Sequence, residues 1–321
     1  MMKNTQSSFN RFSFWALSLV LLLALSACGK GCGKEESPQA PEEAASANKE
    51  QNTSILKAMP DGKNILLSVD WKEFSGSPLG IKFQESAPPE LKSYLQKVER
   101  LTLGIGGPSI EKDPDDILGI AHTSIEEDKF LSEMQDEAQK TGGELAQSEY
   151  QGVKIYQGRN AGRDDFFISF IDGKVLMGLK KSVEKAIDLH QGKGKSIETN
   201  ETLMAKYHSI DTGKTLWLVA SFPEEPAAEA AEADMMEMTP GVGEMDVVAD
   251  LSQGAQVNAG LNFKDAEKAK ELEGMVTMYK SLFGASNPKL ATILNKLEVK
   301  VQDKRADLKL SLNEEELKGL L

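Results

Sequence analysis

Cysteine and histidine are scarce in this chain of 321 residues. The cysteines are Cys28 and Cys32, and the histidines are His122, His190 and His208. No two histidines stand at the short helical spacing that zinc sites use, and no Gly-x-Ser-x-Gly sequence marks a hydrolase nucleophile. The sequence therefore shows none of the residue patterns that nucleophilic catalysis usually requires. From these patterns we predict no catalytic residue, no cofactor and no metal site built on histidine.

Positive charge is also in short supply. The chain has 37 Lys and Arg against 50 Asp and Glu, which is a formal net charge of −13. Loss of residues 1–27, which contain Lys3 and Arg11 and no acidic residue, moves the net charge to −15. A surface of this sign repels phosphate backbones and does not attract anionic lipid head groups. Nucleic acid is therefore not expected as a partner, and a basic patch is not expected to attach the protein to a membrane.

Long apolar runs are absent beyond the N-terminus. The one dense run extends from Phe12 to Leu25, after the basic residues Lys3 and Arg11. It is shorter than the about 20 residues that a helix needs to span a bilayer. A basic start followed by a run of this length is typical of an export signal. The run ends in Leu25-Ser26-Ala27-Cys28, where small residues precede a cysteine.

This tetrapeptide resembles the lipobox of bacterial lipoproteins, which signal peptidase II cuts. The resemblance covers residues 1–28 and implies that residues 1–27 are removed and that Cys28 carries a diacylglyceryl group and a further acyl chain such as palmitate. Two or three chains hold firmly, because each buried methylene contributes about 0.8 kcal/mol. Gly29 stands where an aspartate often retains such proteins at the inner membrane, which favours the outer membrane, facing the periplasm. The alternative is an ordinary signal peptide or an uncleaved anchor.

Residues 28–53 are predicted to form a lipidated, flexible tether. No large apolar residue occurs between Cys32 and Ile55, and small or polar residues dominate. Such a segment buries too little surface to offset its ordering entropy. A lipidated Cys28 cannot ligate a metal as a thiolate, so we expect Cys32 to lie unpaired in the tether rather than in a metal clip.

The remaining chain predicts an α+β fold with a mostly antiparallel sheet and helices on one face. Asp172-Gly173 between two apolar runs predicts a hairpin, because both turn positions favour positive φ. The last two strands alternate apolar with polar residues, as expected where one sheet face is buried. The predicted strands are 65–69, 98–105, 116–123, 152–156, 166–171, 174–179, 215–220, 247–251, 256–262, 297–301 and 306–312. The predicted helices are 90–98, 125–140, 182–191, 199–208 and 265–282, with a short one after Asn313.

A weak internal repeat is visible in this succession. Twice, an apolar strand precedes a strand that leads into an acidic helix, and an alternating hairpin follows. We predict two related halves, residues 54–210 and 211–321. Chance similarity between common strand–helix units is the alternative. The pattern resembles uncharacterised bacterial secreted proteins with duplicated α+β halves, and this resemblance implies no function.

Residues 223–246 are predicted to form a long Met- and Glu-rich loop. Its least ordinary feature is the cluster Met235, Met236, Met238 and Met245. Thioether sulfurs are soft ligands that suit Cu(I), while methionine also serves as an adaptable apolar contact residue. Three interpretations stay open: a copper site, a contact surface for a partner, and a loop without a special role.

Two other motifs fall short of a ligand site. Gly192-Lys193-Gly194-Lys195-Ser196 is similar to the end of a phosphate-binding loop, but Leu189 stands where the first glycine should be, and the segment follows a helix. Asp113, Asp115 and Asp116 resemble part of a calcium loop, but the required glycine and glutamate are out of register. We interpret these aspartates as a solvated turn.

These residues predict a lipid-anchored cell-envelope protein that acts as a non-enzymatic binding or scaffold protein. Its expected partners are the membrane, through the lipid on Cys28, and another envelope protein. One alternative is a carrier that holds an apolar ligand or lipid in a cavity of the sheet. Another is a hydrolase that uses dispersed carboxylates.

Overall fold

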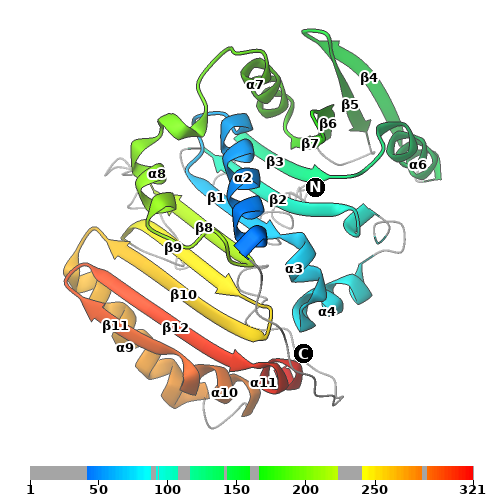
Figure 1. The fold of residues 1–321 in the computed structure, drawn as a ribbon. Helices are drawn as coiled ribbons and strands as arrows, with labels where there is room; N and C mark the ends of the chain where they lie inside the picture. The colour runs from blue at the N-terminus through cyan, green and yellow to red at the C-terminus, as the bar shows by residue number, and fades with distance from the viewer. Residues whose placement is uncertain are drawn as a thin grey trace, which may run out of the picture.

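One antiparallel sheet runs through the whole molecule. The computed structural model describes residues 42–87, 92, 94–107, 116–140, 143–159, 166–222, 241–283 and 288–320. In this part of the chain, twelve strands form a single sheet, and helices pack on it (Figure 1). The α+β class and the antiparallel sheet predicted from the sequence are confirmed.

The strands lie in the order β11-β12-β10-β9-β8-β1-β2-β3-β7-β6-β5-β4. They are β1 (Ile65–Asp70), β2 (Val98–Gly106), β3 (Asp116–Thr123), β4 (Glu144–Tyr150), β5 (Val153–Arg159), β6 (Phe166–Ile171), β7 (Lys174–Gly178), β8 (Leu216–Ser221), β9 (Val242–Asp250), β10 (Gly254–Phe263), β11 (Glu298–Gln302) and β12 (Arg305–Asn313). The helices are α2 (Glu42–Ala58), α3 (Trp71–Gly76), α4 (Pro78–Ser86), α6 (Glu127–Lys140), α7 (Lys180–His190), the 3-10 turn η1 (Ile197–Thr199), α8 (Glu201–His208), α9 (Ala266–Phe283), α10 (Pro288–Lys296) and α11 (Glu314–Leu320).

A similar succession of elements occurs on both sides of the β1–β8 pair, although α3 and α4 lie between β1 and β2 and four strands follow α6 where two follow α10. Strands β1, β2 and β3 form a meander, and so do β8, β9 and β10. Each meander is followed by one or two helices, and then by strands that return to its last strand, with β7 beside β3 and β12 beside β10. The division into two related halves stays a prediction, and this succession supports it.

Both faces of the central strands are buried. Leu66, Leu118 and Trp217 point to one face, where α2, α7 and α8 cover them. Leu67 and Leu218 point to the other, where they join a core that includes residues of α3, α4 and α11. Burial on both faces explains why β1 is an almost unbroken apolar run.

The outer strands β10, β11 and β12 carry their helices on one face, as the sequence predicted. Helices α9 and α10 contact these strands, and α11 contacts β10 and β12. The near side of these strands in Figure 1 carries no helix in the described part of the chain. The prediction of helices on one face therefore holds for the outer strands, whereas helices cover both faces of the central strands.

Helix α2 corrects the predicted tether. It begins at Glu42, so residues 42–53 of the tether predicted for 28–53 are helical, and residues 28–41 lie outside the described residues. Asn52 is 1% exposed, and its Nδ2 donates to the carbonyl of Thr212 at 3.0 Å. The large apolar residues of α2 begin only at Ile55, so hydrophobic periodicity does not reveal its first turns.

The end of the predicted Met-rich loop is also corrected. Residues 242–246 belong to β9, where Val242, Glu244, Met245 and Asp246 pair with β10 and the last three also pair with β8. Residues 223–240 lie outside the described residues. The hairpin predicted at Asp172-Gly173 is confirmed, since both residues have positive φ, 49° and 70°.

Asp116 is buried rather than part of a solvated turn, so that interpretation is wrong. It begins β3 and is 6% exposed. Its carboxylate accepts hydrogen bonds from the fully buried Lys63, from Ser182 Oγ at 2.6 Å and from Lys185 Nζ at 2.9 Å. Three donors offset the desolvation of the carboxylate and join the starts of β3 and α7 to the segment before β1. Asp113 and Asp115 lie outside the described residues.

The environment of Asp116 makes its contribution to stability depend on pH. Burial raises the pKa of this carboxyl, but the hydrogen bonds from Lys63 and Ser182 and the charge of Lys63 outweigh burial and hold the pKa below its ordinary value. A carboxyl with a lower pKa in the folded state stabilises the fold above its unfolded-state pKa. That contribution is lost as the pH falls through the folded-state pKa.

We predict that Asp116→Asn lowers the free energy of unfolding by about 3–5 kcal/mol at pH 7, because the buried Lys63 loses its carboxylate. Urea denaturation measures the difference, which should shrink as the pH falls below about 4. Asp303→Asn is the matched control in an exposed turn and should change stability by less than about 0.5 kcal/mol. A loss as small as the control's, or a difference that does not vary with pH, would contradict the prediction.

Candidate functional site

The sheet splits open between β5 and β6. These strands pair at Tyr156–Ile168, Gln157–Phe167 and Gly158–Phe166, and the pairing stops there. Both strands continue for three further residues, held on their outer sides by β4 and β7. At the inner end of the gap, Ser169 Oγ donates to the carbonyl of Lys154 at 2.8 Å, so a side chain bridges the two strands.

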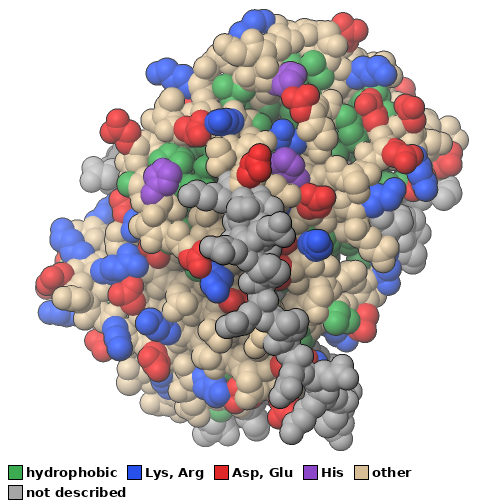
Figure 2. Space-filling view, in the orientation of Figure 1, with side chains coloured by type: hydrophobic (Ala, Val, Ile, Leu, Met, Phe, Trp, Pro, Cys, Tyr) green, Lys and Arg blue, Asp and Glu red, His purple; other side chains and the backbone are tan. Residues whose placement is uncertain are grey.

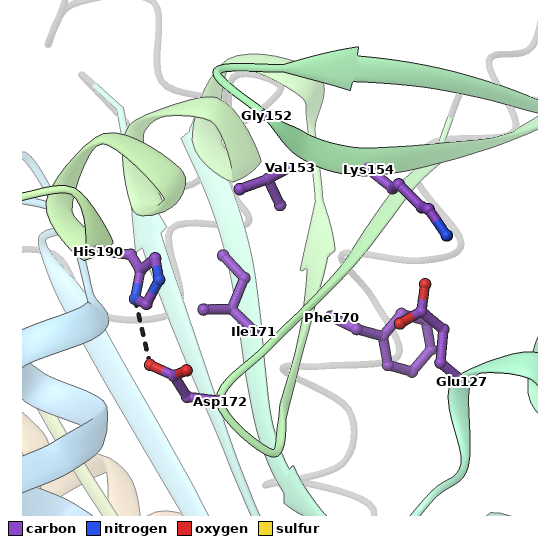
Figure 3. A pocket seen from close by; sticks show the side chains of 8 residues that line it. All are labelled: Glu127, Gly152, Val153, Lys154, Phe170, Ile171, Asp172 and His190. Atoms are coloured by element: carbon purple, nitrogen blue, oxygen red, sulfur yellow. Dashed lines mark ion pairs between the residues drawn. The ribbon is translucent and has the colours of Figure 1, made fainter.

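A hollow of about 300 Å³ lies at this gap (Figure 3). The residues that line it come from the two strands, the start of α6 and the end of α7: Glu127, Gly152, Val153, Lys154, Phe170, Ile171, Asp172 and His190. A second hollow of about 240 Å³ shares Glu127, Phe170, Ile171 and Asp172 and extends to Thr123 and Gly173. The two hollows together form an open depression at one end of the sheet.

The end of α7 ties together the two hairpin turns that border the hollow. The turn between β4 and β5 holds Gln151, whose Nε2 donates to Asp188 Oδ1 at 2.7 Å and whose carbonyl accepts from Gln191 Nε2 at 2.6 Å. The turn between β6 and β7 presents Asp172, which lies 3.2 Å from His190 Nδ1. Positive φ at Gln151 and Asp172 makes both turns tight. The hollow therefore has a defined rim.

The two ends of the hollow carry charge, and its middle is apolar. Figure 3 shows His190 and Asp172 at one end and Lys154 and Glu127 at the other, with the side chains of Val153 and Ile171 between them. The side chains of His190 and Asp172 are 41% and 66% exposed, so their ion pair is screened by solvent.

A hydrogen bond from a buried side chain holds Glu127 in place. The hydroxyl of the buried Tyr156 donates to Glu127 Oε1 at 2.8 Å. Burial, this hydrogen bond and the charge of Glu127 together raise the pKa of Tyr156 above its ordinary range. Tyr156 therefore remains a hydrogen-bond donor at neutral pH, and the second carboxylate oxygen of Glu127 stays available at the hollow.

The lining residues of the hollow are ionisable or apolar, apart from Gly152. The hollow has no serine, threonine or cysteine among its lining residues, so a nucleophile beside His190 is missing there. Among the residues that the structure describes, no group of three or more His, Cys, Asp or Glu side chains is arranged to hold a metal ion.

In that same part of the chain, no helix has the length and apolar character to span a membrane.

The three histidines lie on different elements. His122 is on β3, with its Nε2 buried and without a hydrogen bond, and burial and the charge of Lys174 lower its pKa. His190 ends α7 and His208 ends α8, as the sequence predicted. His190 alone lines the hollow.

The methionine cluster of the predicted loop is not assembled in the described structure. Met235, Met236 and Met238 lie outside the described residues. Met245 lies on β9 and packs against the apolar core, and its weak candidacy as a copper ligand stays a prediction. Cys28, the predicted lipidation site, also lies outside the described residues.

Sequence reasoning missed the hollow. The sequence predicted the turn at Asp172-Gly173. It did not predict the turn at Gln151-Gly152, where both residues have positive φ, or the strand β4 before that turn. A splay between paired strands has no signal in one sequence, because it depends on how distant segments pack together.

Charges of both signs are interspersed on the face drawn in Figure 2, rather than gathered by sign. Groups of both signs also form a network on β9, β10 and β12. There Arg305 bonds Asp246 at 3.2 Å, and Lys206 from α8 lies 3.3 Å from the same carboxylate. Such a network ties strands and helix together and does not form a single-sign binding patch.

No family model matches the chain, and no curated protein matches it. Among solved structures, the chain is similar to crystal forms I, III and IV of TP0453, each at 10% sequence identity. The TM-scores are 0.48, 0.49 and 0.43, and the alignments cover 83%, 83% and 82% of this chain and 95%, 96% and 94% of those chains. At this identity and TM-score, the likeness carries no argument about function.

Proposed function

We propose that the protein is a lipid-anchored, non-enzymatic binding protein of the cell envelope, which holds its ligand in the hollow between β5 and β6. The hollow carries this proposal, because it combines an apolar floor with charged ends and lacks a nucleophile. The lipobox at Leu25–Cys28 supports the anchor, and Gly29 supports the periplasmic side of the outer membrane.

The geometry of the hollow defines the class of ligand. Its volume is at the lower end of the range for small-molecule sites. Val153 and Ile171 suit an apolar group, while Lys154 and Glu127 at one end and His190 at the other suit ionic groups of either sign. Strand edges that end their pairing at Tyr156 and Ile168 add main-chain groups. A short zwitterionic peptide with an apolar side chain has these properties.

A carrier of an apolar ligand is less well supported. Such a carrier needs enclosed apolar space, but apolar side chains fill both faces of the central sheet. The two hollows found in the structure are open and partly lined by charged residues. No specific observation favours a hydrolase with dispersed carboxylates.

We predict that a panel of zwitterionic tripeptides with Val, Leu or Phe in the middle contains members that raise the melting temperature of the wild type by at least about 2 °C. Lys154→Glu reverses a charge at the rim and should weaken binding at least tenfold, as measured by calorimetry. Lys300→Glu makes the same exposed change on β11, at the far edge of the sheet, and should bind like the wild type. The hypothesis fails if no peptide binds, or if the two variants bind equally.

The anchor is tested separately. In cells fed a labelled fatty acid, the wild-type chain should incorporate the label, and Cys28→Ser should not, because the thiol that takes the lipid is gone. Cys32→Ser is the matched control four residues away and should keep the label and the membrane location. Label in the Cys28→Ser chain, or none in the wild type, would rule out lipidation at this position. Sucrose-gradient separation of the two membranes should place the labelled protein in the outer one.

A further inference from the structure

His122 lies between two cationic residues near the end of β3. It pairs with Arg100 of β2 on one side and with Lys174 of β7 on the other. Arg100 is fully buried, whereas Lys174 is partly exposed. Residues that pair across strands carry neighbouring side chains, and like charges directly opposite each other destabilise a sheet. A proton on His122 would therefore place a third positive charge between two others.

A β-bulge brings one carboxylate to the same place. The register of β2 on β3 shifts between Val98 and Arg100, so Glu99 is the extra residue of the bulge. Its charge attracts a protonated His122. However, Glu99 is exposed, and its Oε2 already accepts a hydrogen bond from Gln51 Nε2 of α2 at 2.9 Å. Solvent screens an exposed charge, so Glu99 offsets only part of the repulsion.

The two other carboxylates of this region have partners of their own. Asp70 of β1 bonds Arg100 at 2.9 Å, and this pair is buried. Asp172, at the turn between β6 and β7, lies 3.2 Å from His190 Nδ1 of α7. A charged His122 would therefore have to compete for these carboxylates with the groups that they already bind.

Burial of the imidazole adds to the cost of charging it. Nε2 of His122 is buried and has no hydrogen-bond partner among the described residues. An imidazolium carries hydrogen on both nitrogens, so protonation would leave a buried donor unpaired. Burial and the charges of Lys174 and Arg100 outweigh the charge of Glu99, and they hold the pKa of His122 below its ordinary value of about 6.5.

The turn between β6 and β7 is the side that can yield to the repulsion. Beyond the His122–Lys174 pair, the Thr123 amide of β3 donates to the carbonyl of Gly173 at 3.3 Å. This bond is long for an amide donor. Arg100 on the opposite side is buried and fixed by its own ion pair. A displacement of Lys174 and its turn therefore relieves the repulsion more easily than a displacement of Arg100 does.

We propose that His122 is a pH-sensitive switch, which takes up a proton in acid and releases the turn between β6 and β7 from the end of β3. The turn carries Asp172, Gly173 and Lys174, which line the second hollow. Its release therefore moves one wall of the open depression. Release does not require that either hollow binds a ligand, so the switch goes beyond the function proposed above.

The direction of the effect follows from the two states of the turn. When the turn is released, His122 is exposed to water and regains its ordinary pKa, so the released state binds the proton more tightly. Acid therefore favours release as the pH falls below about 6.5, and the effect levels off below the lower pKa of the closed state. This range lies above the pH of about 4 at which Asp116 begins to lose its contribution to stability.

Hydrogen exchange of the full chain tests the switch at about pH 7.5 and about pH 5, with each rate corrected for the intrinsic exchange rate. We expect the protection of the amides of Thr123 and Val175, which face β7 and β3, to fall by at least about fivefold in acid. The amides of the β10–β12 pair should keep their protection. His122→Gln should abolish the fall, because an amide side chain does not titrate. His208→Gln, the matched control at the exposed end of α8, should show the same fall as the wild type.

A second measurement does not depend on whether His122→Gln folds. Titration of the imidazole of His122 in the wild type, followed by nuclear magnetic resonance, should give a midpoint below about 6.5. Lys174→Gln removes one of the two neighbouring cations and should raise this midpoint and reduce the fall in protection. Lys309→Gln, an exposed change on β12, should leave both unchanged.

Four results would overturn the switch. The first is a midpoint of His122 at or above about 6.5. The second is a protection of Thr123 and Val175 that does not change with pH, and the third is a fall that persists in His122→Gln. The fourth is an equal fall in the β10–β12 pair, which would show general acid unfolding rather than release of one turn.

Discussion

Strands β1 and β8 lie at the centre of the sheet, paired antiparallel from Ile65–Ala220 to Val69–Leu216, and the other strands extend outward on either side of this pair. The pair carries apolar side chains on both faces, so each face collects its own core and its own set of helices. The hydrophobic effect thus makes one continuous structure from two similar successions of strands and helices. Removal of this contact would leave each half with an exposed apolar edge strand.

The twelve-stranded sheet places the hollow and the exposed side of α9 far apart in the strand order. The hollow between β5 and β6 lies near one edge, and α9 lies near the other. The polar interactions of the interior are structural, with Asp116 and Lys63 joining the start of β3 to the segment before β1, and Arg100 bonded to Asp70 at 2.9 Å.

Much of the fold could be predicted, because local patterns carry it. The hairpin at Asp172-Gly173 follows from turn chemistry, and β12 follows from strict alternation. Strand β4 was missed because it is a polar edge strand, and the start of α2 was missed because its first apolar anchor is Ile55. The candidate sites were not predicted, since burial of Asp116 and the splay of β5 from β6 arise from contacts between distant segments.

Helix α9 shows where the two kinds of information divide. By itself, the sequence determined the acidic charge, the antiparallel α+β class and the existence of a helix near residues 265–282, while the export signal and the lipid on Cys28 stay predictions. The tertiary structure decided which side of that helix is covered. Leu272 and Met278 are both apolar, yet the first packs against the core and the second is half exposed. The sequence shows that apolar residues are spread around this helix. Only the contact of the helix with the sheet decides which of them remain exposed.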